Sequence, residues 1–244
     1  MKLVLSYLQA ETIQLLRIPY VVIMSLASPG LFFLILGLPN AKDAASANVV
    51  MASYAMFAVL GIVIFQFGVN IAEDRVSPWE EYLRSLPVTP QTRFISRICM
   101  ALLFALGAAC IIIILGLLFS SARFALNLWL PFIIVLLLGG IPFALLGITI
   151  GYWFPLKAAL PVTNLLYFLL AYAGGLWFPP QYLPAFVANI SSYLPTRQYG
   201  EIVWGVVQGR PWSVWPWLWL LVYTLFFGIL AIGGYRRDEG QRYR

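Results

Sequence analysis

The sequence predicts an all-α membrane protein with six transmembrane helices. Of its 244 residues, 62% are hydrophobic and only 10% are charged, whereas a soluble domain is roughly half apolar and a quarter charged. A soluble fold of this size has more surface than so few polar residues can cover. The apolar runs are continuous and do not alternate with polar residues, which favours helices over a β-barrel. Lipid is therefore the expected solvent.

Long stretches without any charged residue set the number of spans. Each is longer than the roughly 20 residues that a helix needs to cross about 30 Å of hydrocarbon. We expect spans near residues 20–38, 50–72, 98–119, 129–153, 158–178 and 214–234, all in one transmembrane domain over residues 1–244. Gly147 and Gly151 predict a close helix crossing. Bends are expected at Pro142, Pro161 and the Gly174–Gly175 pair.

The basic residues predict the orientation of these spans. With the N-terminus inside, eleven Lys and Arg residues fall in the inner segments, and only Lys42, Arg123, Arg197 and Arg210 fall in the outer ones. This is the positive-inside pattern of a multi-pass protein of the cell's inner (plasma) membrane with both termini in the cytoplasm. It accounts for the net charge of +6, so a nucleic-acid partner is not expected.

Residues 1–19 are too polar to cross the membrane and predict an amphipathic helix that lies in the interface. Val4, Leu5, Leu8, Leu15 and Leu16 share one arc of a helical wheel, and the polar residues lie opposite. The chain would then bend into the bilayer at Pro19. A solvated leader is the alternative.

The inner segment between the second and third spans predicts a short isolated helix over residues 78–86. Ser77, Pro78 and Glu80 form a capping box with proline in the first turn, and Pro87 ends the helix. An apolar stripe runs along it through Trp79, Tyr82, Leu83 and Leu86. Two turns of helix are not stable alone in water, so this helix needs another protein, the lipid headgroups or its own bundle as a partner surface.

The outer segment 179–210 is apolar but is interrupted by prolines at 179, 180, 184 and 195. It is too broken to cross the membrane, so we expect a re-entrant hairpin with short helices near 182–193 and 198–208. Aromatic residues crowd this end of the chain, namely Trp177, Tyr182, Tyr193, Tyr199, Trp204, Trp212, Trp215, Trp217 and Trp219. They predict an interfacial aromatic belt, with a substrate-exit surface as the second interpretation.

Several kinds of chemistry lack the residues they require. The chain has no histidine, and its two cysteines, Cys99 and Cys110, lie about 16 Å apart along one predicted helix, too far for a disulfide. No metal site is expected, and no phosphate-binding Gly-x4-Gly-Lys motif occurs. The polar span residues include Gln66, Asn70, Thr149, Asn164, Tyr167 and Tyr172. Helix–helix hydrogen bonds explain them more simply than a ligand site.

The order of these parts resembles the type-2 ATP-binding-cassette (ABC) exporter permeases. The residues most similar to that family are Glu73-Asp74-Arg75, Trp79-Glu80-Glu81-Tyr82-Leu83-Arg84 and Leu86-Pro87-Val88-Thr89-Pro90. A second match is Gly175-Leu176-Trp177-Phe178-Pro179 with Leu183-Pro184 and Leu194-Pro195. The chain departs from the family at Pro78-Trp79, where Gly-Thr is common.

The resemblance implies a permease subunit that binds no cofactor itself. ATP and Mg²⁺ would bind two separate ABC-type ATPase subunits, and a second permease copy or a sister permease would complete the transporter. Helix 78–86 would be the coupling helix, and the ATPase contacts would come from Glu73, Asp74, Arg75, Trp79, Glu80, Glu81, Leu83 and Arg84. Spans one, two and five would line the substrate path.

The apolar interior suggests a lipophilic or amphipathic substrate, such as a lipid, a drug or a glycoconjugate. Candidates for the substrate path are Gln66, Asn70, Asn164, Tyr167 and Tyr172. Candidates for an outer gate are Phe178, Pro179, Leu183 and Pro184.

Three other functions compete with the transporter. A membrane-embedded lipid-modifying enzyme would need a polar catalytic cluster, for which Glu73, Asp74 and Arg75 are the densest candidate. A secondary carrier or channel would transport without an ATPase, although the predicted spans lack the charges that coupling uses. A structural anchor would leave the broken outer hairpin without a purpose.

Overall fold

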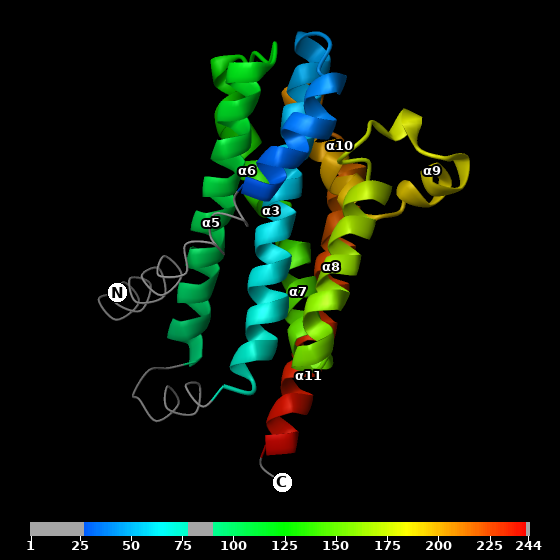
Figure 1. The fold of residues 1–244 in the computed structure, drawn as a ribbon. Helices are drawn as coiled ribbons and strands as arrows, with labels where there is room; N and C mark the ends of the chain where they lie inside the picture. Colours follow the sequence, from blue (N-terminus) through cyan, green and yellow to red (C-terminus); the bar gives the residue numbers. More distant parts are fainter. Residues whose placement is uncertain (1–26, 78–89, 243–244) are drawn as a thin grey trace.

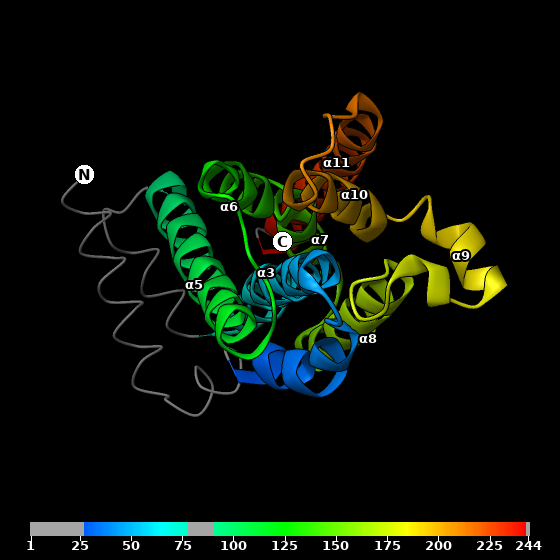
Figure 2. The ribbon, with the colours of Figure 1, turned by 90° about the horizontal axis from the view of Figure 1, so that it is seen from above.

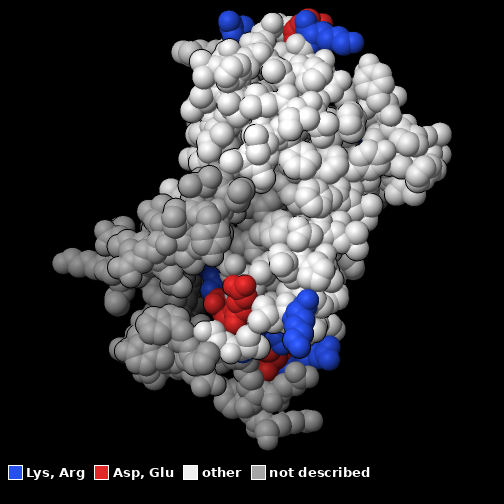
Figure 3. Space-filling model, in the orientation of Figure 1, with Lys and Arg blue, Asp and Glu red and all other residues white. Residues whose placement is uncertain are grey.

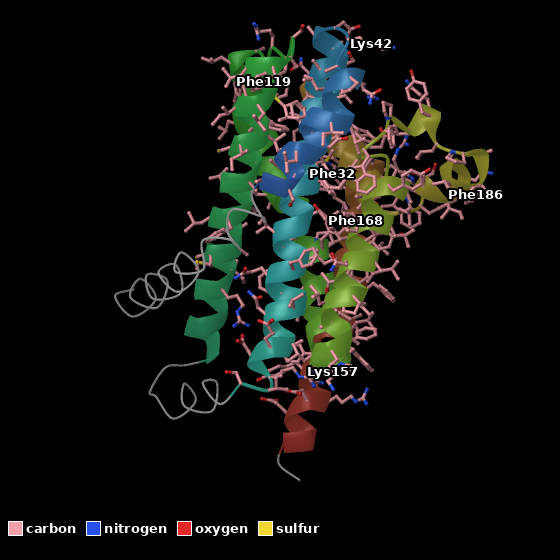
Figure 4. All side chains as sticks on the ribbon, in the orientation of Figure 1. Phe32, Lys42, Phe119, Lys157, Phe168 and Phe186 are labelled. Carbon is pink, nitrogen blue, oxygen red and sulfur yellow. The ribbon has the colours of Figure 1, made fainter. Side chains whose placement is uncertain are left out.

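The computed structural model describes residues 27–77 and 90–242, and every regular element among them is a helix. The helices run side by side along one long axis (Figure 1). We call the end that carries Lys42 the outer end and the end that carries Lys157 the inner end, following the predicted orientation (Figure 4). The predicted interfacial helix 1–19 and coupling helix 78–86 lie outside the described residues.

Helix α3 (Ala44–Asp74) is the centre of the bundle. Seen from above, α5 (Pro90–Phe119), α7 (Ile141–Trp153) and α8 (Leu156–Ala173) surround it (Figure 2). The most apolar window of α3 is 78% buried, against 17% for α11 (Val214–Arg242) at the edge. The α3 helix is therefore shielded by protein, whereas α11 presents most of its surface to lipid.

The start of α3 corrects the expected second span, 50–72, which begins six residues too late. The Asp43 carboxylate accepts a hydrogen bond from the Ser46 backbone N–H at 2.7 Å, and Ser46 Oγ accepts one from the Asp43 N–H at 3.0 Å. This reciprocal capping arrangement lengthens the helix into what was expected to be a loop.

The fourth span, expected as one helix over 129–153, is two helices, α6 (Trp129–Leu138) and α7, after the short 3-10 helix η3 (Leu126–Leu128). The break is at Gly139–Gly140, just before Pro142. A Cβ atom on Gly139 would lie 2.1 Å from the Tyr199 ring, so only glycine leaves room for that buried tyrosine. The bend expected at Pro142 corresponds to this break, and the Tyr199 ring explains why a glycine stands at position 139.

The predicted close crossing at Gly147 and Gly151 is confirmed between α7 and α3. A Cβ atom on Gly147 would lie 2.9 Å from the Ile64 carbonyl oxygen, and one on Gly151 would lie 2.7 Å from Ile71 Cβ. Backbone and side chains of α3 therefore fill the space that larger residues would need.

Five helical runs of the described residues are long and apolar enough to cross a membrane, with Leu126–Trp153, which contains α6 and α7, counted as one. The first expected span, 20–38, is represented by a shorter helical run, Ala27–Asn40, which contains a π-helical turn η1 (Phe33–Gly37) and a 3-10 turn η2 (Leu38–Asn40). The third and sixth spans correspond to α5 and α11. The fifth, expected over 158–178, ends at Ala173, because the chain turns at Gly174–Gly175 and Gly175 has φ +80°.

The outer hairpin consists of the 3-10 turn η4 (Pro180–Tyr182), α9 (Ala185–Ser191) and α10 (Pro195–Val207). Prolines stand at or next to the start of each element, as expected from a residue with no backbone N–H to donate. Helix α9 is shorter than the expected 182–193, whereas α10 begins three residues before the expected 198–208 and ends one residue before it. The labelled Phe186 lies well below Lys42 along the bundle axis (Figure 4), the depth expected of a re-entrant hairpin.

Charged side chains gather at the two ends of the visible face, with an uncharged band between them (Figure 3). Large apolar side chains along α5, α8 and α11 are exposed, including Leu118, Leu165 and Ile229. An uncharged apolar belt between two charged ends is the surface of a multi-pass membrane protein.

Candidate functional site

Arg75 joins three helices at the inner end of the bundle. Its Nε donates to Asp238 Oδ1 of α11 at 2.7 Å, and an Nη donates to the carbonyl oxygens of Gly151 at 2.9 Å and Phe154 at 3.2 Å. Those carbonyls belong to the last turn of α7, where helical partners run out. A single guanidinium therefore satisfies both the carboxylate of α11 and the C-terminus of α7.

The neighbouring Asp74 forms an ion pair with Arg97 of α5. This pair ties the last turn of α3 to α5, so it joins the two helices that flank residues 78–89. We call Arg75, Asp238, Asp74 and Arg97 the inner clasp. The clasp side chains are between 11% and 36% exposed, so water screens them only in part.

The inner clasp changes the interpretation of part of the predicted ATPase contact. Asp74 and Arg75 contact this chain's own helices, and Glu73 beside them is exposed. Trp79, Glu80, Glu81, Leu83 and Arg84 lie outside the described residues. Sequence reasoning did not find Arg97 or Asp238 as members of this site. The available signal was that Arg97 and Asp238, at the inner ends of the expected third and sixth spans, are opposite in charge to Asp74 and Arg75 at the inner end of the second.

The same contacts bear on a catalytic cluster at Glu73, Asp74 and Arg75. Two of the three side chains are engaged in ion pairs between helices, as structural residues are. Across residues 27–77 and 97–239, no group of three or more His, Cys, Asp or Glu side chains is placed to hold a metal ion. Cys99 and Cys110 are both free thiols, as their spacing predicted.

Helix α10 is fixed to three other helices at the outer end by side-chain hydrogen bonds. Thr196 Oγ1 donates to the Leu170 carbonyl of α8 at 2.8 Å, and Tyr199 Oη donates to the Leu136 carbonyl of α6 at 2.5 Å. Trp204 Nε1 donates to Ser53 Oγ of α3 at 2.8 Å. We call Thr196, Tyr199 and Trp204 the outer anchors; all three are buried.

The outer anchors correct the expected aromatic belt. Tyr199 is 0% exposed and Trp204 is 5% exposed, so neither lies at a lipid interface. Trp212 and Trp215 are each 65% exposed and do have the position that a belt requires. The expected belt residues therefore include two buried anchors on α10, exposed rings such as Tyr182, Tyr193, Trp212 and Trp215, and the half-buried Trp177, Trp217 and Trp219.

An aromatic cluster joins the three elements expected to line the substrate path. Phe32 stacks on Trp177 with ring centroids 5.4 Å apart, and Phe57 of α3 stacks on Tyr167 of α8 at 4.6 Å. Phe168 contacts both Phe32 and Trp177 at 6.3 and 5.8 Å, and the labelled rings of Phe32 and Phe168 are neighbours in Figure 4. Ring contacts thus connect the run Ala27–Asn40, α3 and α8.

The predicted path residues differ in burial and in their contacts. Tyr167 is buried and its hydroxyl donates to the Phe57 carbonyl at 3.2 Å, while Tyr172 packs on Trp177. Asn164 donates to the Leu160 carbonyl of its own helix at 3.3 Å. Gln66 and Asn70 are half-buried on α3. Thr149, which is not a path candidate, forms the helix–helix hydrogen bond expected of a polar span residue. Its hydroxyl donates to the Phe227 carbonyl of α11 at 3.2 Å.

The predicted gate residues lie between α8 and α9. Phe178 and Pro179 are half-buried in the turn after α8, and Leu183 packs with Ala173 and Val187. Pro184 is the residue before α9. Pro179 also borders a cavity of about 570 Å³ between the start of α3, this turn and α10. Of the four gate candidates, Pro179 therefore lies beside an outer cavity.

A comparison with known families decides between the competing functions. The family described as "ABC-2 family transporter protein" matches residues 5–232. The chain belongs to this family. The curated proteins gave no match.

As a member of the ABC-2 family, the chain is a multi-pass membrane permease of an ABC transporter. The family assigns it the part of a transport subunit and not that of an enzyme. ABC-2 permeases usually work with an ATP-binding subunit, which gives the kind of partner. The inner clasp and the outer anchors then hold helices together at the two ends of a permease fold.

Proposed function

We propose that the chain is one half of an ATP-driven exporter in the inner (plasma) membrane, with both termini in the cytoplasm. Two ABC-type ATPase subunits would bind ATP and Mg²⁺, and a second permease copy or a sister permease would complete the pathway. The cargo would be lipophilic or amphipathic and would leave the cytoplasm by alternating access. The observation that carries the proposal is the ABC-2 family match over residues 5–232.

The inner clasp supports this proposal because it supplies a route for force. An ATPase that displaces the segment 78–89 pulls on the end of α3 and the start of α5, which Asp74 and Arg97 tie together. Arg75 passes the displacement to α7 and α11 through Gly151, Phe154 and Asp238. The close crossing of α3 on α7 makes these two helices move as one body.

The aromatic cluster supports an apolar cargo. Its rings lie between the run Ala27–Asn40, α3 and α8, which correspond to expected spans one, two and five. Phe168 is 39% exposed and Leu165 is 66% exposed on the outward face of α8. A second permease copy set against this face would enclose a path with aromatic and aliphatic walls.

Co-purification tests the proposed coupling. The full chain is expressed with a candidate ABC ATPase from the same genome. Trp79→Ala or Glu80→Ala is then compared with Glu239→Ala, which removes an exposed acid at the inner end. Loss of contact area should release the ATPase from Trp79→Ala, and Glu239→Ala should retain it. An ATPase that stays bound and fully stimulated by both Trp79→Ala and Glu80→Ala contradicts the assignment of the coupling helix.

A further inference from the structure

A second outer cavity, of about 560 Å³, lies between α10 and the start of α11. Two arginines, Arg197 and Arg210, line it together with the aromatic rings of Trp212, Trp215, Trp217 and Trp219. Only four of the chain's fifteen basic residues fall in its predicted outer segments, and two of these four meet at this cavity. Concentrated positive charge beside interfacial tryptophans matches a phospholipid headgroup region.

Arg197 is held in place within this cavity. Its Nε donates to Glu201 at 2.9 Å, and its guanidinium lies 5.5 Å from the centre of the Trp204 ring. A guanidinium has five N–H donors, and Arg197 uses two of its nitrogens on Glu201. Arg210 donates through Nε to Gln208. Arg197 and Arg210 together outweigh the negative charge of Glu201, so the cavity lining is net positive. Such a lining can bind a phosphate group.

An aromatic ladder leads from the cavity along α11. Trp215, Trp219, Tyr223 and Phe227 are spaced four residues apart, so they share one helix face. Successive ring centroids are 6.4, 6.1 and 5.9 Å apart. The ladder spans about 18 Å along the helix axis, slightly more than the roughly 15 Å of one leaflet's hydrocarbon. An acyl chain whose headgroup occupies the cavity would lie along these rings.

We propose that this cavity binds an anionic phospholipid of the outer leaflet. Arg197 and Arg210 bind the phosphate, the tryptophans surround the glycerol region, and an acyl chain packs on the aromatic ladder. The two arginines and Glu201 also border the first outer cavity, so the bound headgroup lies on the wall between the two cavities. The proposal depends on the fold and on the predicted orientation, and it does not require that the chain act as an exporter.

Native mass spectrometry of the purified full chain tests the site. The chain is titrated with phosphatidylglycerol, with diacylglycerol of the same acyl chains, and with glycerol 3-phosphate as a competitor. Phosphatidylglycerol should bind about a hundredfold more tightly than diacylglycerol, the ratio expected when each of the two arginines contributes one charge-assisted hydrogen bond. Glycerol 3-phosphate should not compete at equal concentration, because it has no chain to place on the ladder.

Variants identify the residues that bind the lipid. Arg210→Gln should weaken phosphatidylglycerol binding about tenfold, and Arg210→Lys should restore part of the loss. Arg123→Gln removes the same charge at another outer position and should leave binding unchanged. Equal binding of phosphatidylglycerol and diacylglycerol overturns the proposal. So does an equal loss in Arg123→Gln, or competition by glycerol 3-phosphate, which would indicate a site for a soluble phosphate.

Discussion

The two ends of this helix bundle are held together by different chemistry. At the inner end, Arg75 and Asp74 join α3 to α5, α7 and α11 through charged groups that water reaches in part. At the outer end, Thr196, Tyr199 and Trp204 join α10 to α3, α6 and α8 through neutral hydrogen bonds that are buried. Charged contacts respond to salt and to a docking protein, whereas buried neutral ones do not. The inner end is thus suited to transmit a signal, and the outer end to hold a fixed shape.

The largest expected effect comes from removing an outer anchor. Tyr199→Ala deletes a fully buried ring and leaves the Leu136 carbonyl without its donor. We expect a loss of about 3–5 kcal/mol in unfolding free energy, as for other buried aromatic residues. Chemical unfolding in detergent measures it. Tyr199→Phe, which keeps the ring, should cost only about 1 kcal/mol, and neither loss should depend on salt. A Tyr199→Ala loss that disappears in high salt would contradict the comparison.

A smaller effect is expected at the inner clasp. Arg75→Gln removes the ion pair with Asp238, whose side chain is 11% exposed. We expect about 2 kcal/mol of lost stability, below the range for fully buried pairs because water reaches this one in part. The double variant Arg75→Gln/Asp238→Asn should recover part of the loss, since it leaves no unpaired carboxylate. Unfolding at low and high salt measures both. If the loss in Arg75→Gln is the same at every salt concentration, screening does not reach the clasp.

The smallest expected effect comes from Asp43, a charged group at the outer end. It shows whether sensitivity to solution conditions depends on charge or on which end of the bundle a group occupies. Its hydrogen bonds with Ser46 lower the pKa of the Asp43 carboxyl below its ordinary value of 3.8. The cap therefore stabilises the folded chain above pH 3.8 and is lost as the pH falls through the lower folded pKa.

Asp43→Asn keeps a capping side chain but cannot titrate. Its thermal midpoint should fall less than that of the wild type between pH 6 and pH 3, measured in the same detergent. An equal fall in both proteins would show that this cap does not respond to pH.

Much of this fold is readable from the sequence, since a helix in lipid must be long and apolar. The five long apolar helical runs, the crossing at Gly147 and Gly151, and the proline-interrupted hairpin all follow from local composition. Even the start of α3 had a readable signal, because Asp43 and Ser46 have the spacing of a capping box. These features depend only on residues that are close in sequence.

The functional contacts were harder to predict because they depend on which helices are neighbours. Arg75 and Asp238 are 163 residues apart, and the sequence around one residue does not indicate the other as its partner. Tyr199 and Trp204 look like belt residues, since an aromatic side chain near an interface can face lipid or protein. Glycine at position 139 is explained by Tyr199, a residue of a distant helix. Each of these required the tertiary arrangement.

The most direct test of the coupling account compares two variants in one ATPase assay with the full chain and its ATPase in nanodiscs. Trp79→Ala removes the proposed contact, and Arg75→Gln leaves that contact in place but cuts the link to α7 and α11. The account predicts that Trp79→Ala loses both ATPase binding and stimulation. It predicts that Arg75→Gln still binds the ATPase but no longer stimulates it. Full stimulation by Arg75→Gln would contradict the claim that the inner clasp transmits the motion.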